Sequence, residues 1–137
     1  MAVFTSAEWL NKFMDALNGS KAYADAATTW EGDFYMIVEA GGAVKAPVYM
    51  YLDLWHGKCR KVEIVTEKDK EKYKPEFILS AALPTWRKVA EKKVDPIQAI
   101  VTRQLKLQGN MGKIMRAVKA AQELVNCVTK VQTEYPE

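Results

Sequence analysis

The hydrophobic pattern at the start of the chain predicts an amphipathic helix that begins at Thr5 and ends before Gly19. Thr5 and Glu8 have the spacing of a capping box, and Phe4 and Trp9 have that of a hydrophobic staple. The apolar residues that recur at helical spacing are Trp9, Leu10, Phe13, Met14 and Leu17. Gly19 is suited to the end of a helix, and the Ala-rich residues 20–27 predict a further short helical turn.

The pattern then changes and predicts an antiparallel meander of three strands. Residues 28–39 are rich in β-forming side chains, and residues 58–66 place Val62 and Ile64 on one face. Between them, Val48, Met50, Leu52 and Leu54 alternate with Tyr49, Tyr51, Asp53 and Trp55. His56-Gly57 is a two-residue hairpin signal. The aromatic face of the middle strand can be covered by a helix or pair with a second subunit.

The second half of the chain predicts a mixture of short elements. The charge run over residues 67–75 alternates in sign, which favours a solvated helical turn over a phosphate-binding patch. Residues 77–81 predict a short buried strand, and Pro84 with Trp86 opens a helix. Asp95-Pro96 has the N-cap and N1 residues of another helix.

The last part of the chain predicts a strand followed by one long helix. Arg103, Leu105 and Leu107 alternate with polar residues, Gly109 turns the chain, and Asn110 caps the helix. The apolar stripe of that helix consists of Met111, Ile114, Met115, Val118, Ala121, Leu124, Val125 and Val128. Because strands are grouped rather than alternating with helices, the order predicts an α+β fold, a largely antiparallel sheet with helices on one face.

Composition supports a single domain over residues 1–137. The chain is 49% hydrophobic and 27% charged, which is globular composition, and its length suits one core. The net charge of +3 is too small to indicate nucleic-acid binding. Neither a membrane span nor a secretion signal is read from the sequence, so we expect a cytoplasmic protein with two reduced thiols, Cys59 and Cys127.

Candidate chemistry is sparse. His56 is the single histidine, and the sequence has no phosphate-binding or dinucleotide-binding glycine motif. Residues 109–112 (GNMG) can cradle an anion at a helix start, but chain reversal and capping are the simpler role. The acidic pair Glu31/Asp33 shows no sign of burial. We therefore expect no catalytic site, no metal and no cofactor.

The apolar residues leave two interpretations open. Met is flexible and polarizable, so a stripe with Met111 and Met115 lying over a sheet can fill a core or form the wall of a ligand cavity. Periodicity does not separate these two possibilities.

A family resemblance favours the cavity. Trp86, residues 95–100 (DPIQAI) and residues 105–110 (LKLQGN) resemble the sterol carrier protein 2 (SCP-2) domain family, in which a Trp-bearing helix precedes a DP helix start and an L-x-L strand. The first half agrees more loosely, through residues 30–34 (WEGDF) and the meander. The resemblance extends from about Ser6 to Val128, and the order and spacing of the short motifs carry it.

The resemblance implies an SCP-2-like α+β sandwich, a five-stranded, largely antiparallel sheet covered on one face by helices, with an apolar tunnel between the layers. It implies non-catalytic binding and transfer of a fatty acid, fatty acyl-CoA or sterol-like lipid. The expected ligand-binding residues are Trp86, Ile100, Leu105 and Leu107 in the matched motifs, Met111, Met115 and Val118 on the last helix, and Phe34, Met36 and Met50 by alternation. Arg103 or Lys106 can meet an anionic head group or simply face solvent.

The chain also departs from the family pattern. It lacks the terminal peroxisomal tripeptide of many eukaryotic members, and Thr102-Arg103-Gln104 replaces the Gly that often precedes the L-x-L strand. A second functional hypothesis is an accessory domain that binds a lipid-metabolism enzyme; an enzyme acting on acyl-CoA-like substrates is a third. The expected partners are a hydrophobic small molecule and a transient membrane contact, without nucleic acid, for a monomer or homodimer.

Overall fold

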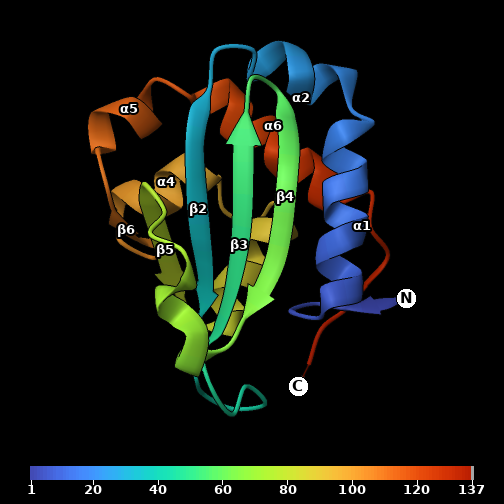
Figure 1. Cartoon of the computed structure of the whole chain (residues 1–137), viewed down its shortest axis with the longest axis vertical. Helices are drawn as coiled ribbons and strands as arrows, with labels where there is room; N and C mark the ends of the chain where they lie inside the picture. Colours follow the sequence, from blue (N-terminus) through green and yellow to red (C-terminus); the bar gives the residue numbers. More distant parts are fainter. Residues whose placement is uncertain (137) are drawn as a thin grey trace.

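The central element is a five-stranded sheet. The computed structural model describes residues 1–136 and orders the strands β4-β3-β2-β5-β6 (Figure 1). The strands are β2 (Glu31–Val38), β3 (Val48–Trp55), β4 (Lys58–Val65), β5 (Phe77–Ala81) and β6 (Lys106–Gln108). All neighbouring pairs are antiparallel except β2 and β5, which run parallel. The predicted α+β class and meander are confirmed, and the parallel pair makes the sheet mixed.

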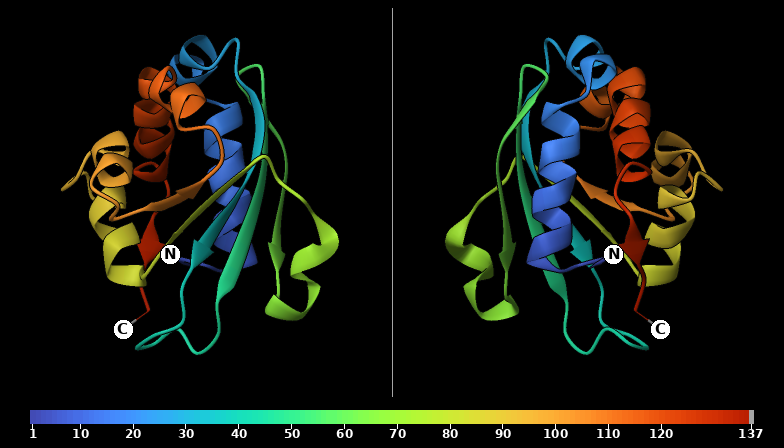
Figure 2. Two further views of the ribbon diagram at one scale, coloured as in Figure 1. Left: turned by 90° about the vertical axis from the view of Figure 1, so that its left-hand side faces the viewer. Right: turned by 90° about the vertical axis from the view of Figure 1, so that its right-hand side faces the viewer.

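Helices cover one face of this sheet, as predicted (Figure 2). They are α1 (Ala7–Asn18), α2 (Lys21–Ala26), α3 (Leu83–Ala90), α4 (Pro96–Val101), α5 (Met111–Met115) and α6 (Val118–Val128). A short 3₁₀ segment, η1 (Glu67–Lys72), lies on the opposite side of the sheet (Figure 2). Two short strands, β1 (Ala2–Val3) and β7 (Thr133–Glu134), pair in parallel and bring the two ends of the chain together.

The first helix begins one residue later than the capping box predicts. Ser6 is the N-cap, and its hydroxyl accepts from the backbone N–H of Trp9 at 3.1 Å, while Thr5 adopts a positive φ of 82°. A side-chain acceptor at Ser6 satisfies an otherwise unpaired N–H of the first turn, so it replaces Thr5 as the cap. The predicted staple is confirmed, because the rings of Phe4 and Trp9 meet edge to face at 4.8 Å.

The predicted hairpin between β3 and β4 is also confirmed. His56 and Gly57 have φ angles of 49° and 79°, the two positive values that a type I′ turn requires. Gly57 is further constrained by packing, because a Cβ atom built there would lie 2.6 Å from the carbonyl oxygen of Ala24. The hairpin tip therefore rests directly on the backbone of α2.

The last helix is two helices, which corrects the prediction of one long one. Ala117 has φ −113° and ψ 32°, outside the helical region, and its N–H bonds to Ile114 three residues back. The break lets α5 stay at the end of the sheet while α6 packs against α1 and α2. The predicted last strand is shorter as well, because β6 starts at Lys106 and buried Leu105 precedes it.

The second face of the sheet carries a tyrosine cluster, formed by Tyr35, Tyr49, Tyr51 and Tyr73 with Val65. The rings of Tyr51 and Tyr73 stack at 3.7 Å. The Tyr35 hydroxyl donates to the carbonyl of Lys70, and that of Tyr49 donates to Glu67 at 2.5 Å. The chain's own η1 segment, a short helical cover of the kind expected, therefore lies over these tyrosines.

A matched pair of glycine substitutions tests the hairpin contact. Both Gly57 and Gly42 have positive φ, but only Gly57 lies against backbone atoms, since nothing lies within 4 Å of a Cβ at Gly42. We expect Gly42→Ala to cost about 1 kcal/mol of unfolding free energy, and Gly57→Ala to cost a further 1–3 kcal/mol or so from the forced displacement of α2. Urea denaturation of both variants measures the difference, and equal midpoints would refute the contact.

The tyrosine cluster predicts a loss of stability at high pH. Burial and the hydrogen bond to Glu67 raise the pKa of Tyr49 to about 12, and burial also raises the pKa of Tyr35. A raised pKa in the folded state favours folding below the unfolded value of about 10, and this contribution disappears as the pH approaches 12. The urea concentration at the midpoint of unfolding should therefore decrease as the pH is raised from about 10 to about 12. The decrease should be less steep in Tyr49→Phe. If the urea midpoint of Tyr49→Phe depended on pH as steeply as that of the wild type, the assignment of this pH dependence to Tyr49 would be wrong.

Candidate ligand-binding site

An apolar cavity lies between the sheet and its helical layer. It has a volume of about 120 Å³, and within residues 1–136 no charged side chain lines it. Strands β2 and β3 form its floor, through residues such as Phe34, Met50 and Leu52, because alternation points these side chains toward the helices. The helical side includes residues of α1, α3, α4, α5 and α6.

Six of the ten residues expected to bind a ligand line this cavity. They are Phe34 and Met36 on β2, Met50 on β3, Trp86 on α3, Ile100 on α4, and Leu105 before β6. Trp86 is fixed by its indole N–H, which donates to the carbonyl of Ile37 at 2.9 Å. Their position in one cavity is consistent with a common ligand, and contact with a ligand stays a prediction.

The other four residues lie outside the cavity lining. Met111 and Met115 are 43% and 41% exposed, because on α5 it is Ile114 that points inward. Leu107 and Val118 are half-buried and pack against the core. The sequence pattern places these residues on one apolar stripe, but the helix break at Ala117 divides that stripe between α5 and α6. The residues therefore do not form one continuous wall. A role for them in ligand contact also stays a prediction.

Several lining residues were missed from the sequence. Trp9 and Phe13 of α1 and Tyr23 of α2 reach the cavity, together with Trp30 before β2 and Leu54 of β3. Their helical spacing or alternation marked most of them as apolar-face residues. Only the packing of α1 and α2 against the sheet shows that this face meets the cavity rather than ordinary core.

An aromatic stack forms part of the cavity wall, since two of its three rings, Trp30 and Phe34, line the cavity. The rings of Trp30, Phe34 and Phe77 lie 5.2–5.8 Å apart. The Lys113 ammonium of α5 lies 5.0 Å from the centre of the Trp30 ring and pairs with the Glu76 carboxylate at 2.8 Å. Lys113 also donates to the carbonyl of Glu31. This one side chain therefore attaches α5 to this end of the sheet, beside the aromatic stack.

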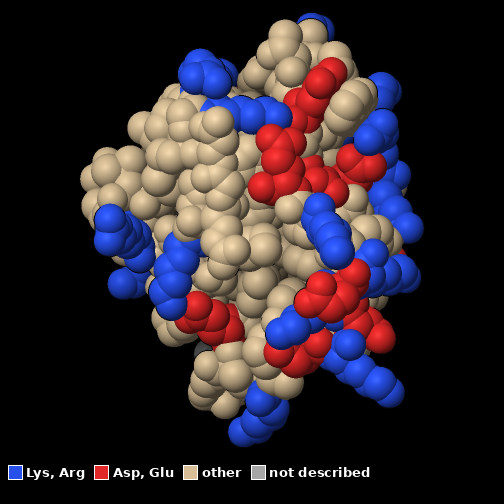
Figure 3. Space-filling model, turned by 60° about the vertical axis from the view of Figure 1, so that its left-hand side comes forward, with Lys and Arg blue, Asp and Glu red and all other residues tan. Residues whose placement is uncertain are grey.

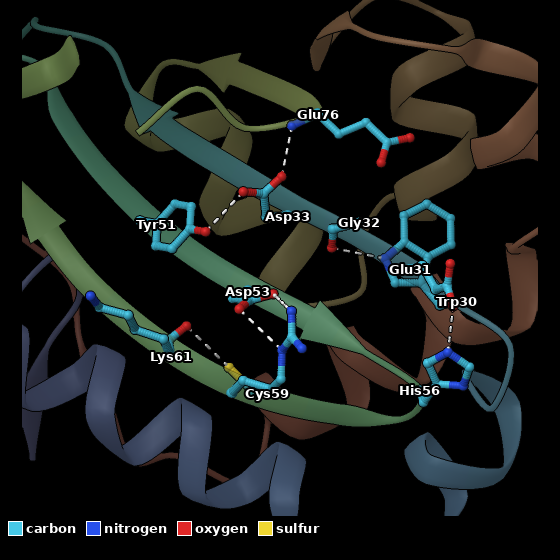
Figure 4. Close-up of polar contacts among 11 residues, drawn as sticks. Trp30, Glu31, Gly32, Asp33, Tyr51, Asp53, His56, Cys59, Lys61 and Glu76 are labelled. Carbon is cyan, nitrogen blue, oxygen red and sulfur yellow. Dashed lines mark hydrogen bonds and ion pairs between the residues drawn. The ribbon is translucent and has the colours of Figure 1, made fainter. Parts of the chain in front are cut away.

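The polar groups beside this end are paired with one another (Figure 4). His56 Nε2 lies 2.6 Å from Glu31 Oε2, and both side chains are half-exposed. Asp33 accepts from the Tyr51 hydroxyl at 2.8 Å and from the backbone N–H of Glu76 at 2.7 Å. Each carboxylate already has its partners, so the group stabilises this end of the strands and presents no acid–base pair to the cavity.

The remaining candidate anion contacts also have structural roles. Asn110 Oδ1 accepts from the backbone N–H of Lys113 at 3.0 Å, so residues 109–112 cap α5, the simpler of the two roles considered. Lys106 pairs with Glu39 at 2.9 Å on the surface, and Arg103 is exposed. Neither Arg103 nor Lys106 lines the cavity.

The two thiols and the carboxylates form no metal site. Cys59 and Cys127 are buried and unpaired by a disulfide. Burial raises the pKa of the Cys59 thiol to about 12 and raises that of Cys127 as well. Over residues 1–136, no group of three His, Cys, Asp or Glu side chains is arranged to hold a metal ion. In the same range, no helix is long and apolar enough to cross a membrane.

Comparison with known proteins identifies relatives of this fold. A family model described as the SCP-2 sterol transfer family matches residues 10–122. A crystal structure of sterol carrier protein 2 superposes with a TM-score of 0.83 at 31% identity, covering 93% of this chain and 98% of that one. No curated protein matches the chain.

Two further solved structures extend the comparison. A solution structure of a possible sterol carrier protein from Thermus thermophilus gives a TM-score of 0.86 at 31% identity, covering 98% of this chain and 93% of that one. The palmitated SCP2L2 of Aedes aegypti gives 0.59 at 14% identity, over 85% of this chain and 94% of that one, which is a likeness of fold alone.

The buried thiols predict low reactivity in the folded protein. Alkylation and disulfide exchange proceed through the thiolate, which a raised pKa and burial both suppress. At about pH 8, we expect Cys59 and Cys127 to react with a thiol reagent at least ~100-fold more slowly in the native protein than in urea. With an aromatic disulfide as the reagent, the absorbance of the thiolate that it releases measures the rate. Fast labelling of the native protein would contradict the burial of Cys59 and Cys127.

Proposed function

The chain belongs to the SCP-2 sterol transfer family, and on that premise we propose that it binds a fatty acid or fatty acyl-CoA in the cavity between sheet and helices. The family and its solved members support lipid binding and transfer in general terms. In this proposal the protein carries its ligand and performs no bond-making chemistry on it.

The observation that carries the proposal is the uniformly apolar lining of the cavity. Transfer of an acyl chain from water into such surroundings gains about 0.8 kcal/mol per methylene, so a ligand needs few polar contacts for useful affinity. No charged side chain among residues 1–136 lines the cavity, so the polar head group must remain at its rim. This arrangement suits a ligand with a long apolar part and one polar end.

The size of the cavity constrains how the ligand enters. At about 120 Å³ it is smaller than the roughly 300–1,000 Å³ of ordinary small-molecule sites, so an acyl chain must displace part of the wall. Most of the half-buried lining residues lie on α6 or at the break before it, namely Ala117, Ala120, Ala121, Leu124 and Val128, so this is the most exposed part of the wall. We assign the opening to this side.

The same size favours a flexible acyl chain over a rigid sterol ring system. A flexible chain follows a narrow apolar space by rotation about its single bonds, whereas fused rings require the whole width at once.

A small resting cavity also favours a second candidate function. If the apolar space never opens, the domain binds a partner protein, such as a lipid-metabolism enzyme, and the cavity is vestigial. The two functions differ in one measurable property, which is saturable binding of a lipid by the isolated protein.

A cavity-filling substitution tests the lipid site. Ala121 lines the cavity, so Ala121→Phe should weaken binding of a fluorescent fatty acid at least ~10-fold by occupying the ligand's space. Ala46→Phe is the matched control, because Ala46 is exposed and distant from the cavity lining, and its affinity should equal that of the wild type. Absence of saturable binding and of co-purified lipid in native mass spectrometry would favour the protein-interaction function instead.

A further inference from the structure

The Lys113 ammonium of α5 lies deeper in the protein than the other paired lysines. Its side chain is 30% exposed, the lowest value among the ion-paired lysines of residues 1–136. Besides the Glu76 carboxylate, it contacts the carbonyl of Glu31 and the rings of Trp30 and Phe77. These contacts hold the positive charge at a fixed place between α5 and the sheet.

This place adjoins the ligand cavity. The Trp30 ring, whose centre lies 5.0 Å from the ammonium, lines the cavity, and so does Ile114, the next residue of α5. No other ring that a Lys or Arg side chain contacts in residues 1–136 lines the cavity. Lys113 is therefore the cation that these ring contacts place against the cavity wall.

The structure provides a position for a carboxylate beside Lys113. Gly32 is buried on β2, and a Cβ atom there would lie 3.2 Å from the Trp30 and Phe77 rings and 3.3 Å from Glu76 Oε1. The absence of a side chain at Gly32 therefore leaves room for a carboxylate next to both rings. Glu76 fills this space, and its second oxygen pairs with the Lys113 ammonium at 2.8 Å.

The carboxylate position is in line with the floor of the cavity. Gly32, Phe34 and Met36 alternate along β2 and face the same side of the sheet, and the last two line the cavity. Two residues of a strand span about 7 Å, so an acyl chain lying over Phe34 would end near the space above Gly32. A free carboxylate at that end of the chain would then reach the Lys113 ammonium.

Glu76 can leave this position at small cost. Its backbone N–H is fixed by Asp33 at 2.7 Å, but its side chain is half-exposed and extends away from Asp33 (Figure 4). When a ligand carboxylate replaces it, the ammonium keeps an anionic partner and the Glu76 carboxylate turns to water. An alcohol, ester or thioester carries no charge and would leave the ammonium with a weaker partner, so the exchange favours a free acid.

The surrounding charges favour one carboxylate over the several phosphates of coenzyme A. Figure 3 shows the side of the molecule that carries α5 and β6, where Asp and Glu side chains lie next to Lys and Arg side chains. Several phosphate groups on this face would meet negative as well as positive charge. The Lys113 ammonium offers a single charge, which a single carboxylate matches.

We propose that Lys113 binds the carboxylate of a free fatty acid, and that Glu76 occupies the same position as an internal competitor until the ligand arrives. The inference rests on the proposed function and narrows its ligand from a fatty acid or acyl-CoA to the free acid. It assigns the head-group contact to α5, directly before the break at Ala117 where we place the opening. Lys113 thereby takes the role that the sequence suggested for Arg103 or Lys106.

Two ligands of equal chain length separate the contribution of the head group from that of the chain. Calorimetric titration with dodecanoic acid and with dodecanol at about pH 8, where the acid is ionised, gives the two affinities and their ratio. In Lys113→Met, which keeps an unbranched apolar side chain, we expect the acid-to-alcohol affinity ratio to fall at least ~5-fold. If the substitution only loosened α5, both affinities would change together, and a constant ratio would overturn the assignment.

Removal of the competitor should act in the opposite direction. In Glu76→Gln the ammonium loses its internal carboxylate, so dodecanoic acid should bind at least ~3-fold more tightly, with the affinity for dodecanol nearly unchanged. If Glu76 served only to attach α5, the acid would bind this variant no more tightly than the wild type, and the competitor role would be refuted.

A second ion pair supplies matched controls. Lys106 and Glu39 pair at 2.9 Å, and neither residue lines the cavity. Lys106→Met and Glu39→Gln make the same changes of charge and should leave the affinity ratio at its wild-type value. Equal shifts in these controls would show that overall charge, rather than Lys113, selects the acid.

The wild-type titrations keep this inference distinct from the proposed function. Binding of neither ligand would overturn the proposed function, and this inference with it. Binding of both ligands, with a ratio that does not respond to Lys113→Met, would leave the proposed function standing and overturn the carboxylate site alone.

Discussion

The alternation of side chains along β3 is the constraint on which the rest of the structure depends. This strand lies between β4 and β2, and both of its faces are buried. Met50, Leu52 and Leu54 face the helices, whereas Tyr49 and Tyr51 face η1. Because neighbouring side chains must point to opposite faces, one strand separates an apolar layer that contains the cavity from a tyrosine layer held by carboxylates.

The two layers differ in the interactions that stabilise them, and that difference explains where ligand can bind. In the tyrosine layer, the hydroxyls of Tyr49 and Tyr35 donate to Glu67 and to the carbonyl of Lys70 in η1, so displacing η1 would break both hydrogen bonds. In the apolar layer, contacts are non-directional, and a ligand's methylenes can replace them at little loss. A binding space that must expand is therefore better placed on the helical side of the sheet.

The break between α5 and α6 connects the cavity with the outer surface. Because Ala117 leaves the helical conformation, α5 is an independent short element, attached to the sheet through Lys113 at Glu76 and Trp30. In a continuous helix, Met111, Ile114 and Val118 would lie on one face with a fixed orientation relative to one another. The break instead presents Ile114 to the cavity and the two Met side chains to solvent, so one element serves both sides of the wall.

Local sequence determined the α+β class, the meander, the His56-Gly57 turn and the start of α4 at Asp95, because caps, turns and alternation act between residues close in the chain. It also placed Phe34, Met36 and Met50 on the apolar face, and the family motifs indicated Trp86, Ile100 and Leu105. Only the tertiary structure decided that β5 lies parallel to β2, that α5 and α6 separate at Ala117, and that Trp9 and Tyr23 reach the cavity. These features depend on packing between segments far apart in the chain, which periodicity within a single segment does not encode.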